Sequence, residues 1–100
     1  MVVTSQPVLV EVLAHVSRLG THTRELAVRL VDALEEDPFV TIEAQTPELS
    51  RDGFRIYRDR ADKSYSATDC MSMSICEPLG IREVLTNDHH FAQEGFTILL

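Results

Sequence analysis

The chain has 100 residues, of which 44% are hydrophobic and 25% are charged. This length and composition describe one small globular domain and exclude a disordered tail or a fibrous repeat. The longest apolar runs are a few residues, far short of the roughly 20 that a membrane span needs, and no signal peptide is recognisable. We therefore expect a cytoplasmic protein that makes no contact with a membrane.

Charge and cysteine content narrow the class further. Sixteen acidic residues against nine Lys and Arg give a formal net charge of −7, which argues against tight, purely electrostatic binding to a polyanion. Any role on nucleic acid would need the help of cations. Cys70 and Cys76 are the only cysteines, and their spacing fits neither a zinc site nor a secreted disulfide framework. We expect both to be reduced residues of a helix.

The first half of the chain predicts two helices and a strand. Residues 6–19 carry apolar side chains at helical spacing, with Pro7 in the first turn and Gly20 as terminator. A second helix begins after Thr23 and ends before Asp37, where Pro38 follows. Its expected core stripe consists of Leu26, Leu30 and Leu34, backed by Ala27, Val31 and Ala33. Alternation over 39–44 then predicts a strand.

The second half predicts two more helices and two short strands. Thr46 and Pro47 open a third helix, and the Ser66 and Asp69 pair has the form of a capping box that opens a fourth, ending near Gly80. A strand at 83–86, a helical turn at 91–94 and a strand at 96–100 follow.

This order of elements predicts an α/β fold whose helices cover a short parallel sheet. Strands 39–44 and 83–86 are expected to be joined by a right-handed crossover. Three short strands make a thin sheet for this class, as if an opening strand were absent.

Three acids stand out by position: Glu11 in the first helix, Asp69 in the first turn of the fourth, and Asp88 directly after the strand 83–86. Sites in open parallel sheets lie beyond the carboxyl ends of the strands, where Asp69 and Asp88 could converge. Clustered carboxylates are stable together when one takes a proton or a divalent cation bridges them, and hard oxygen ligands suit Mg²⁺ or Mn²⁺.

Each of these acids also has a purely structural interpretation. Asp69 alone reads as a member of a capping box, Glu11 as a solvated side chain opposite the apolar stripe, and Asp88 as a turn former. His89 and His90 are adjacent and point apart on any regular element, which disfavours a zinc site, although either could act as a general base.

Three segments of the chain resemble a known family. The stretch DKSYSATDCMSMSI at 62–75, followed by VLTNDHHFAQEGFTILL at 84–100, resembles the C-terminal half of bacterial PIN domains of the VapC type. The stretch VTSQPVLVEVLAHVSR at 3–18 resembles the family's helix that bears its second conserved acid. The resemblance covers essentially the whole chain and implies a PIN-like, three-layer α/β/α fold, as a single domain over 1–100.

What the resemblance implies is a cytoplasmic, Mg²⁺- or Mn²⁺-dependent endoribonuclease that hydrolyses RNA phosphodiesters as the toxin of a toxin–antitoxin pair. Glu11, Asp69 and Asp88 would be its catalytic residues and metal ligands. Weaker candidates for contacts with these ligands or with the substrate are Thr68, Thr86, Asn87, His89 and Asp62. The partners implied are RNA, an antitoxin protein and a second copy of the chain.

One departure from the family concerns its opening strand, which ends in the first catalytic Asp and forms the centre of the sheet. No residues before Val2 can supply it. We therefore expect an N-terminally truncated domain, through an internal start or natural shortening, with impaired catalysis. The alternative function is a catalytically incomplete PIN remnant that binds protein or RNA, and a histidine-based sensor using His15, His89 and His90 is a third hypothesis.

Overall fold

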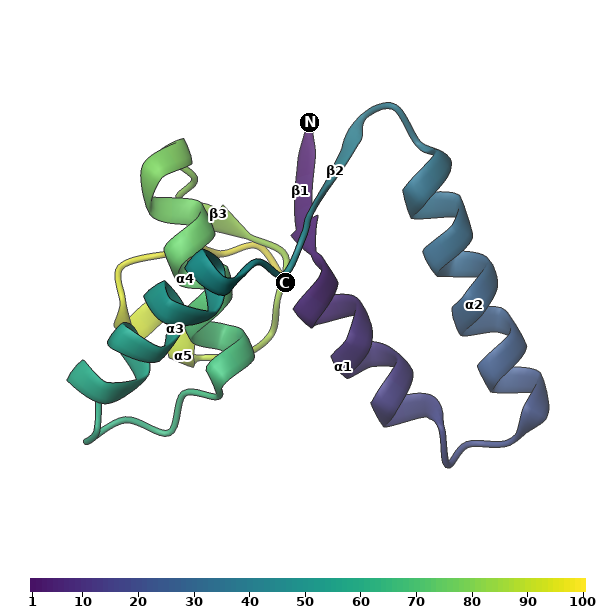
Figure 1. Ribbon diagram of the computed structural model, residues 1–100, viewed down its shortest axis with the longest axis horizontal. Helices are drawn as coiled ribbons and strands as arrows, with labels where there is room; N and C mark the ends of the chain where they lie inside the picture. The colour runs from purple at the N-terminus through teal and green to yellow at the C-terminus, as the bar shows by residue number, and fades with distance from the viewer. The chain divides into compact units, whose positions relative to one another are not determined.

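The computed structural model describes all 100 residues, and the chain divides into two compact units, Met1–Gln45 and Thr46–Leu100 (Figure 1). Each unit holds two parallel strands and at least two helices. The expected α/β class with short parallel sheets is therefore confirmed. The single domain expected over 1–100 stays a prediction. None of the helices has the length and apolar character that crossing a membrane requires.

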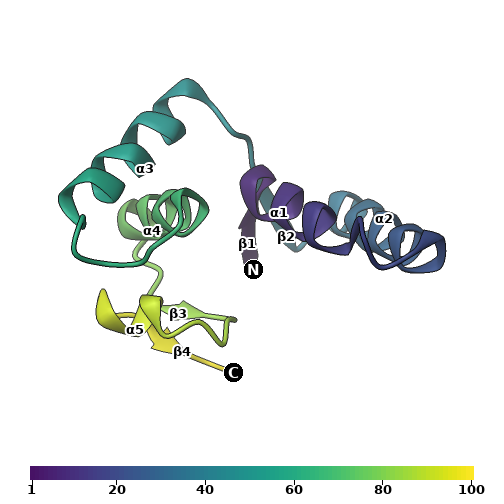
Figure 2. The ribbon, with the colours of Figure 1, turned by 90° about the horizontal axis from the view of Figure 1, so that it is seen from below.

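The first unit consists of a parallel pair of strands and a helical hairpin. Its elements are β1 (Val2–Ser5), α1 (Gln6–Val16), α2 (Thr21–Glu36) and β2 (Val40–Glu43). The two strands pair in register from Val2 opposite Val40 to Ser5 opposite Glu43. Figures 1 and 2 both show α1 and α2 side by side. Gly20 adopts a φ of 96° in the turn between them, a conformation that favours glycine.

Ser5 joins the strand to the first helix. It is the last residue of β1 and the N-cap of α1, and its hydroxyl accepts a hydrogen bond of 3.4 Å from the backbone N of Val8. The Gln6 side chain then accepts a hydrogen bond of 2.8 Å from the backbone N of Gln45. Ser5 thus caps the first helix, and this cap sets the direction in which α1 leaves the strand.

Strand β1 was not among the expected elements, so the expectation of three strands is wrong. The stretch has only four residues, too few for a period-2 pattern to identify a strand. Its pairing with β2 is what makes it a strand, because a partner supplies the backbone hydrogen bonds that so short a segment lacks alone. Strand β1 carries no acidic residue.

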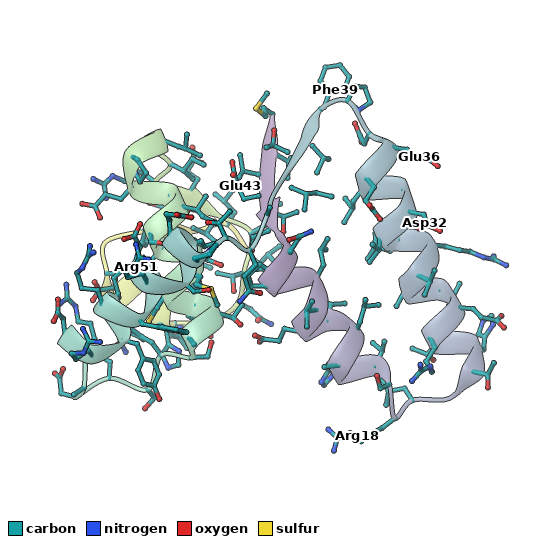
Figure 3. All side chains as sticks on the ribbon, viewed as in Figure 1. Arg18, Asp32, Glu36, Phe39, Glu43 and Arg51 are labelled. Atoms are coloured by element: carbon teal, nitrogen blue, oxygen red, sulfur yellow. The ribbon has the colours of Figure 1, made fainter.

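The core stripe expected on the second helix is also partly wrong. Leu26 and Leu30 are 48% and 53% exposed, whereas Ala27 is buried and Val31 and Leu34 are half-buried. The helix begins at Thr21, three residues earlier than predicted. Both stripes have helical spacing, and the small side chain of Ala27 lets its stripe approach the rest of the unit more closely. Figure 3 shows the exposed Phe39 at the turn between α2 and β2.

The second unit is built on a pair of packed helices. Its elements are α3 (Pro47–Asp59), α4 (Ala67–Leu79), β3 (Glu83–Val84), α5 (His90–Gln93) and β4 (Thr97–Ile98). Thr46 caps α3 as predicted and accepts a hydrogen bond of 3.1 Å from the backbone N of Leu49. The absence of a side chain at Gly53 lets α3 lie directly against Met71 of α4.

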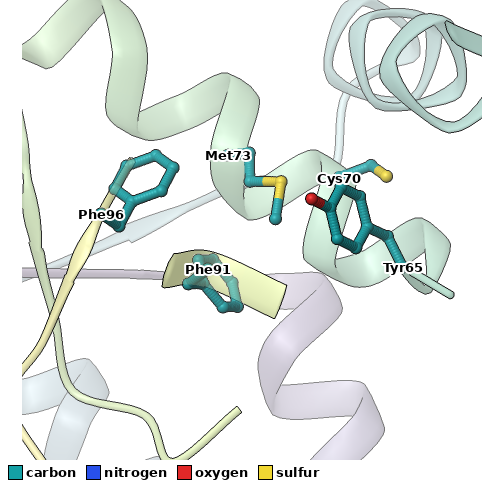
Figure 4. Packing of buried hydrophobic residues seen from close by; sticks show 5 residues of the cluster. All are labelled: Tyr65, Cys70, Met73, Phe91 and Phe96. Atoms are coloured by element: carbon teal, nitrogen blue, oxygen red, sulfur yellow. The ribbon is translucent and has the colours of Figure 1, made fainter. Parts of the chain in front are cut away.

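Buried side chains from four segments form the core of this second unit (Figure 4). The cluster consists of Tyr65, Cys70, Met73, Phe91 and Phe96. The rings of Phe91 and Phe96 meet edge to face with centroids 5.8 Å apart, a favoured geometry. Because Cys70 follows Asp69 and Phe91 follows His90 in the chain, this core holds the start of α4 beside the start of α5.

The sheet topology differs from the predicted crossover. Strand β2 pairs with β1, and β3 pairs with β4 through the register Glu83 to Thr97 and Val84 to Ile98. The expected connection of 39–44 and 83–86 within one sheet is therefore wrong. The reason is that each strand finds its partner within its own unit, and β3 and β4 are only two residues long.

Candidate metal-binding site

Asp69 lies in the first turn of α4, where the Ser66 capping box fixes its side chain. The Ser66 hydroxyl accepts a hydrogen bond of 3.0 Å from the backbone N of Asp69, and Asp69 Oδ2 accepts one of 3.1 Å from the backbone N of Ser66. The predicted capping box is confirmed. Within the carboxylate of Asp69 only Oδ2 is hydrogen-bonded, and Oδ1 makes no hydrogen bond inside the chain.

Asp88 lies in the loop between β3 and α5, where a turn fixes it in a similar way. Its backbone N donates a hydrogen bond of 3.1 Å to the Thr86 hydroxyl. Its Oδ1 accepts one of 3.0 Å from the backbone N of His90, the first residue of α5. The side-chain-to-backbone turn expected of an Asp at this position is present, and Oδ2 makes no hydrogen bond inside the chain.

The two carboxylates meet at the imidazole of His90. His90 Nδ1 lies 3.4 Å from Asp69 Oδ2 and 3.1 Å from Asp88 Oδ1. One potential ligand atom from each of the three side chains lies within 4.8 Å of the others. The side chains are 17%, 27% and 39% exposed for Asp69, His90 and Asp88. The group is thus open enough for an ion or a substrate to reach it.

This donor set fits a divalent cation. Two carboxylates offer hard oxygen ligands for Mg²⁺ or Mn²⁺, and an imidazole nitrogen is a donor that Mn²⁺ accepts more readily than Mg²⁺ does. Oδ1 of Asp69 and Oδ2 of Asp88 carry no hydrogen bond within the chain, so each carboxylate could bind an ion while keeping its structural hydrogen bonds.

Neighbouring groups give the site its electrostatic surroundings. Burial raises the pKa of the Cys70 thiol, and the charge of Asp69 raises it further, so Cys70 is a neutral side chain beside the site. Burial raises the pKa of Tyr65 to about 12, with the hydrogen bond to Glu94 contributing in the same direction. The hydrogen bond from Arg60 lowers the pKa of Glu94, whereas burial opposes that shift. Tyr65 is therefore neutral and Glu94 ionised at neutral pH.

The remaining predicted site residues lie in different surroundings. Thr86 contacts Asp88 through the hydrogen bond described above, and Thr68 is half-buried in the first turn of α4. Asn87 and His89 are exposed on the loop that carries Asp88. Asp62 has a 76% exposed side chain, 3.9 Å from Lys63 Nζ, and does not join the carboxylates.

Glu11 belongs to the first unit, where it is exposed on α1. Its surface position agrees with the structural interpretation given above, and its role as a ligand stays a prediction.

The sequence suggested His90 only as a general base or as part of a histidine-based sensor, and did not place it beside Asp69 and Asp88. The pair His89 and His90 follows Asp88 directly, and the pattern alone could not show which ring turns back to the carboxylate. The turn at Asp88 decides this, because its Oδ1 holds the backbone N of His90 at the start of α5. The structure brings His90 to the carboxylates and leaves His89 exposed.

The chain matches known proteins in two comparisons. The family model described as PIN domain matches residues 1–96. Among solved structures, the chain is similar to the crystal structure of Mycobacterium tuberculosis VapC20, a toxin that cleaves the sarcin-ricin loop, with a TM-score of 0.82 and 24% sequence identity. The match covers 97% of this chain and 72% of that chain. Comparison with curated proteins gave no match.

Proposed function

The chain belongs to the PIN domain family, and we propose that it is a metal-dependent endoribonuclease of the VapC type. The observation that carries the proposal is the meeting of Asp69 and Asp88, which come from separate elements of the second unit and face one imidazole. Their positions are those at which the family resemblance expects two of its conserved acids. The similarity to the VapC20 structure supports the same fold for this chain.

In the proposed site, Asp69 and Asp88 would hold Mg²⁺ or Mn²⁺, and each has a carboxylate oxygen free of hydrogen bonds within the chain for this purpose. When bound, the ion supplies a water of lowered pKa and offsets the negative charge of the scissile phosphate. The capping box holds Asp69 and the Asp88 turn holds the second carboxylate, so neither side chain has to be ordered when the ion arrives. An acidic chain can accept an anionic substrate at this place because the cation neutralises the carboxylates.

Other residues have subordinate proposed roles. Glu11 would complete the acidic pocket, as the resemblance implies. Thr86 orients Asp88, and the exposed Asn87 and His89 lie on the same loop, where RNA could contact them. Thr68 is proposed as a weaker contact beside Asp69.

Asp62 has the weakest support of the predicted residues, because its side chain is exposed and is not part of the group formed by Asp69, Asp88 and His90. We propose it only as a contact with substrate at the margin of the site.

The proposed partners follow from family membership. RNA is the substrate class, and a structured stem-loop is the first target to test because VapC20 cleaves the sarcin-ricin loop. An antitoxin protein and a second copy of the chain are the proposed protein partners, and the cytoplasm is the proposed location.

The experiment that tests the proposal is cleavage of a labelled stem-loop RNA in Mn²⁺, in Mg²⁺ and in EDTA. We expect cleavage only with metal and its loss in the double variant Asp69→Asn/Asp88→Asn. A matched control is Asp52→Asn/Asp59→Asn, which removes two exposed acids of α3 that are not part of the group formed by Asp69, Asp88 and His90, and it should cleave like the wild-type chain. Metal-independent cleavage, or equal cleavage by the Asp69→Asn/Asp88→Asn variant, would refute the proposal. RNA binding without cleavage by a folded chain would instead favour a binding module.

A further inference from the structure

Tyr65 stands at the centre of a set of contacts that the proposed chemistry does not use. It lies directly before the cap of α4 and is 5% exposed within the core of the second unit. One of its neighbours is the ring of His90, with centroids 5.2 Å apart and planes inclined by 58°. Aromatic rings at this separation attract one another and restrict one another's rotation. The Tyr65 ring therefore packs against the His90 imidazole, and the imidazole in turn faces the two carboxylates.

The hydroxyl of Tyr65 is anchored from the other side. It donates a hydrogen bond of 2.8 Å to Glu94 Oε2. Arg60 Nε donates to the same carboxylate, 3.2 Å from Oε1 and 3.1 Å from Oε2. The raised pKa of Tyr65 keeps the hydroxyl a donor throughout the neutral range. Residues from the end of α3, the loop before α4 and the end of α5 thus fix the position of one ring.

We propose that Tyr65 is a positioning residue, which holds the His90 imidazole so that Nδ1 serves as a third donor beside Asp69 and Asp88. The inference rests on the proposed function, since it concerns the same metal site. Its geometric basis is the continuous set of contacts from Arg60 and Glu94 through Tyr65 to His90.

Tyr65 occupies a buried core position that a phenylalanine could also fill, so its hydroxyl needs an explanation. A phenylalanine would fill the same space but leave Glu94 with Arg60 as its remaining partner. The hydroxyl anchor limits movement of the ring, and the ring limits rotation of His90, so the nitrogen is already oriented when a cation binds. Partners that orient a metal ligand in this way are typically worth 10- to 100-fold in metal affinity or activity.

The test measures Mn²⁺ affinity of the whole chain by electron paramagnetic resonance, which detects the free ion. We expect Tyr65→Leu to weaken Mn²⁺ binding by about tenfold and Tyr65→Phe to weaken it by about threefold. The matched control is Tyr57→Leu, at an exposed tyrosine of α3, which should bind Mn²⁺ like the wild-type chain. His90→Ala should weaken binding at least as much as Tyr65→Leu.

A double variant separates positioning from general damage to the fold. If Tyr65 acts through His90, Tyr65→Leu/His90→Ala should bind Mn²⁺ no more weakly than His90→Ala alone, whereas independent effects would multiply. A measurement made without metal complements this comparison of the single and double variants. The imidazole signals of His90 in the nuclear magnetic resonance spectrum should move in Tyr65→Leu, because they lose the ring current of Tyr65, and should stay in place in Tyr57→Leu.

Several results would overturn the inference. The first is unchanged or tighter Mn²⁺ binding in folded Tyr65→Leu. The second is a double variant whose loss of Mn²⁺ affinity equals the product of the losses in the two single variants. If Tyr65→Leu does not fold, unchanged Mn²⁺ binding by Tyr65→Phe overturns it.

The experiments distinguish a failure of the positioning role from a failure of the proposed function. Mn²⁺ binding that depends on Tyr65 in a chain that cuts no RNA would keep the positioning role and reject the nuclease. Mn²⁺-dependent cleavage that is indifferent to Tyr65 would do the reverse, and a chain that binds no Mn²⁺ would reject both.

Discussion

Asp69 has a structural role that is certain and a metal-binding role that is proposed, and two substitutions separate them. Asp69→Asn keeps a side-chain oxygen that can accept the hydrogen bond from the backbone N of Ser66, but it removes the charge. Asp69→Ala removes both. Without metal, the lost charge at the start of a helix costs about 0.3–1 kcal/mol of unfolding free energy in either variant, and the lost repulsion from Asp88 offsets part of this cost. The lost hydrogen bond costs Asp69→Ala a further 0.5–1.5 kcal/mol or so.

Bound metal should change the relative stabilities of the wild-type chain and the two Asp69 variants. An ion that binds only the folded chain stabilises it by about 2.7 kcal/mol at a concentration 100 times its dissociation constant. We expect the wild-type chain to gain this amount in Mn²⁺ and both Asp69 variants to gain much less. Asp69→Asn would then be close to wild type in EDTA and well below it in Mn²⁺. Urea denaturation followed by circular dichroism, with and without Mn²⁺, measures these differences.

The matched control for this comparison is Glu48→Gln. Glu48 is the acid in the first turn of α3, so its charge has a similar helix position, but it is not part of the group formed by Asp69, Asp88 and His90. It should keep the full gain in Mn²⁺. An Asp69→Asn chain that gains as much stability from Mn²⁺ as the wild-type chain would show that capping is the only role of this carboxylate.

Two further predictions concern the structure around the site. Gly53→Ala should lower the unfolding free energy by about 1–2 kcal/mol, because a Cβ there overlaps Met71 Cγ and the cost of overpacking exceeds the gain in helix propensity. Thermal denaturation checks this, and the same change should cost less in a Met71→Ala background. The free energy of unfolding should also fall as pH rises from about 10 to about 12, because the unfolded chain releases the Tyr65 proton there while the folded chain keeps it. Tyr65→Phe should lack this pH dependence in urea titrations, and an identical dependence in that variant would refute the assignment.

Local sequence signals located most of the elements because they act over three or four residues. Thr46 and Ser66 accept hydrogen bonds from the backbone three residues ahead, as their spacing predicts, and Gly80 ends α4 with a left-handed conformation. Such signals need no knowledge of the rest of the molecule. They also place Asp69 at the start of a helix and Asp88 after a strand, which is why the sequence alone identifies both as candidate site residues.

The errors arose where distant segments decide the outcome. The segment Val2–Ser5 is too short for a sequence pattern to identify a strand, and its pairing with β2 is what makes it one. Leu26 and Ala27 lie on adjacent stripes of α2, and the burial of Ala27 follows from what packs against it, although leucine is the more hydrophobic residue. His90 could not be separated from His89 because the choice depends on the course of the backbone after Asp88.

The structural and the functional interpretation of the two carboxylates are compatible in this geometry. The cap of α4 engages Oδ2 of Asp69, and the turn before α5 engages Oδ1 of Asp88, so each carboxylate keeps one oxygen free. Holding two carboxylates close together is unfavourable unless a positive charge lies between them. Their hydrogen bonds to the backbone oppose that repulsion by keeping both side chains in place. The same contacts that make each Asp a good residue for the start of a helix therefore prepare the pair to bind a cation. A substitution that removes the charge and keeps the hydrogen bond distinguishes the two roles.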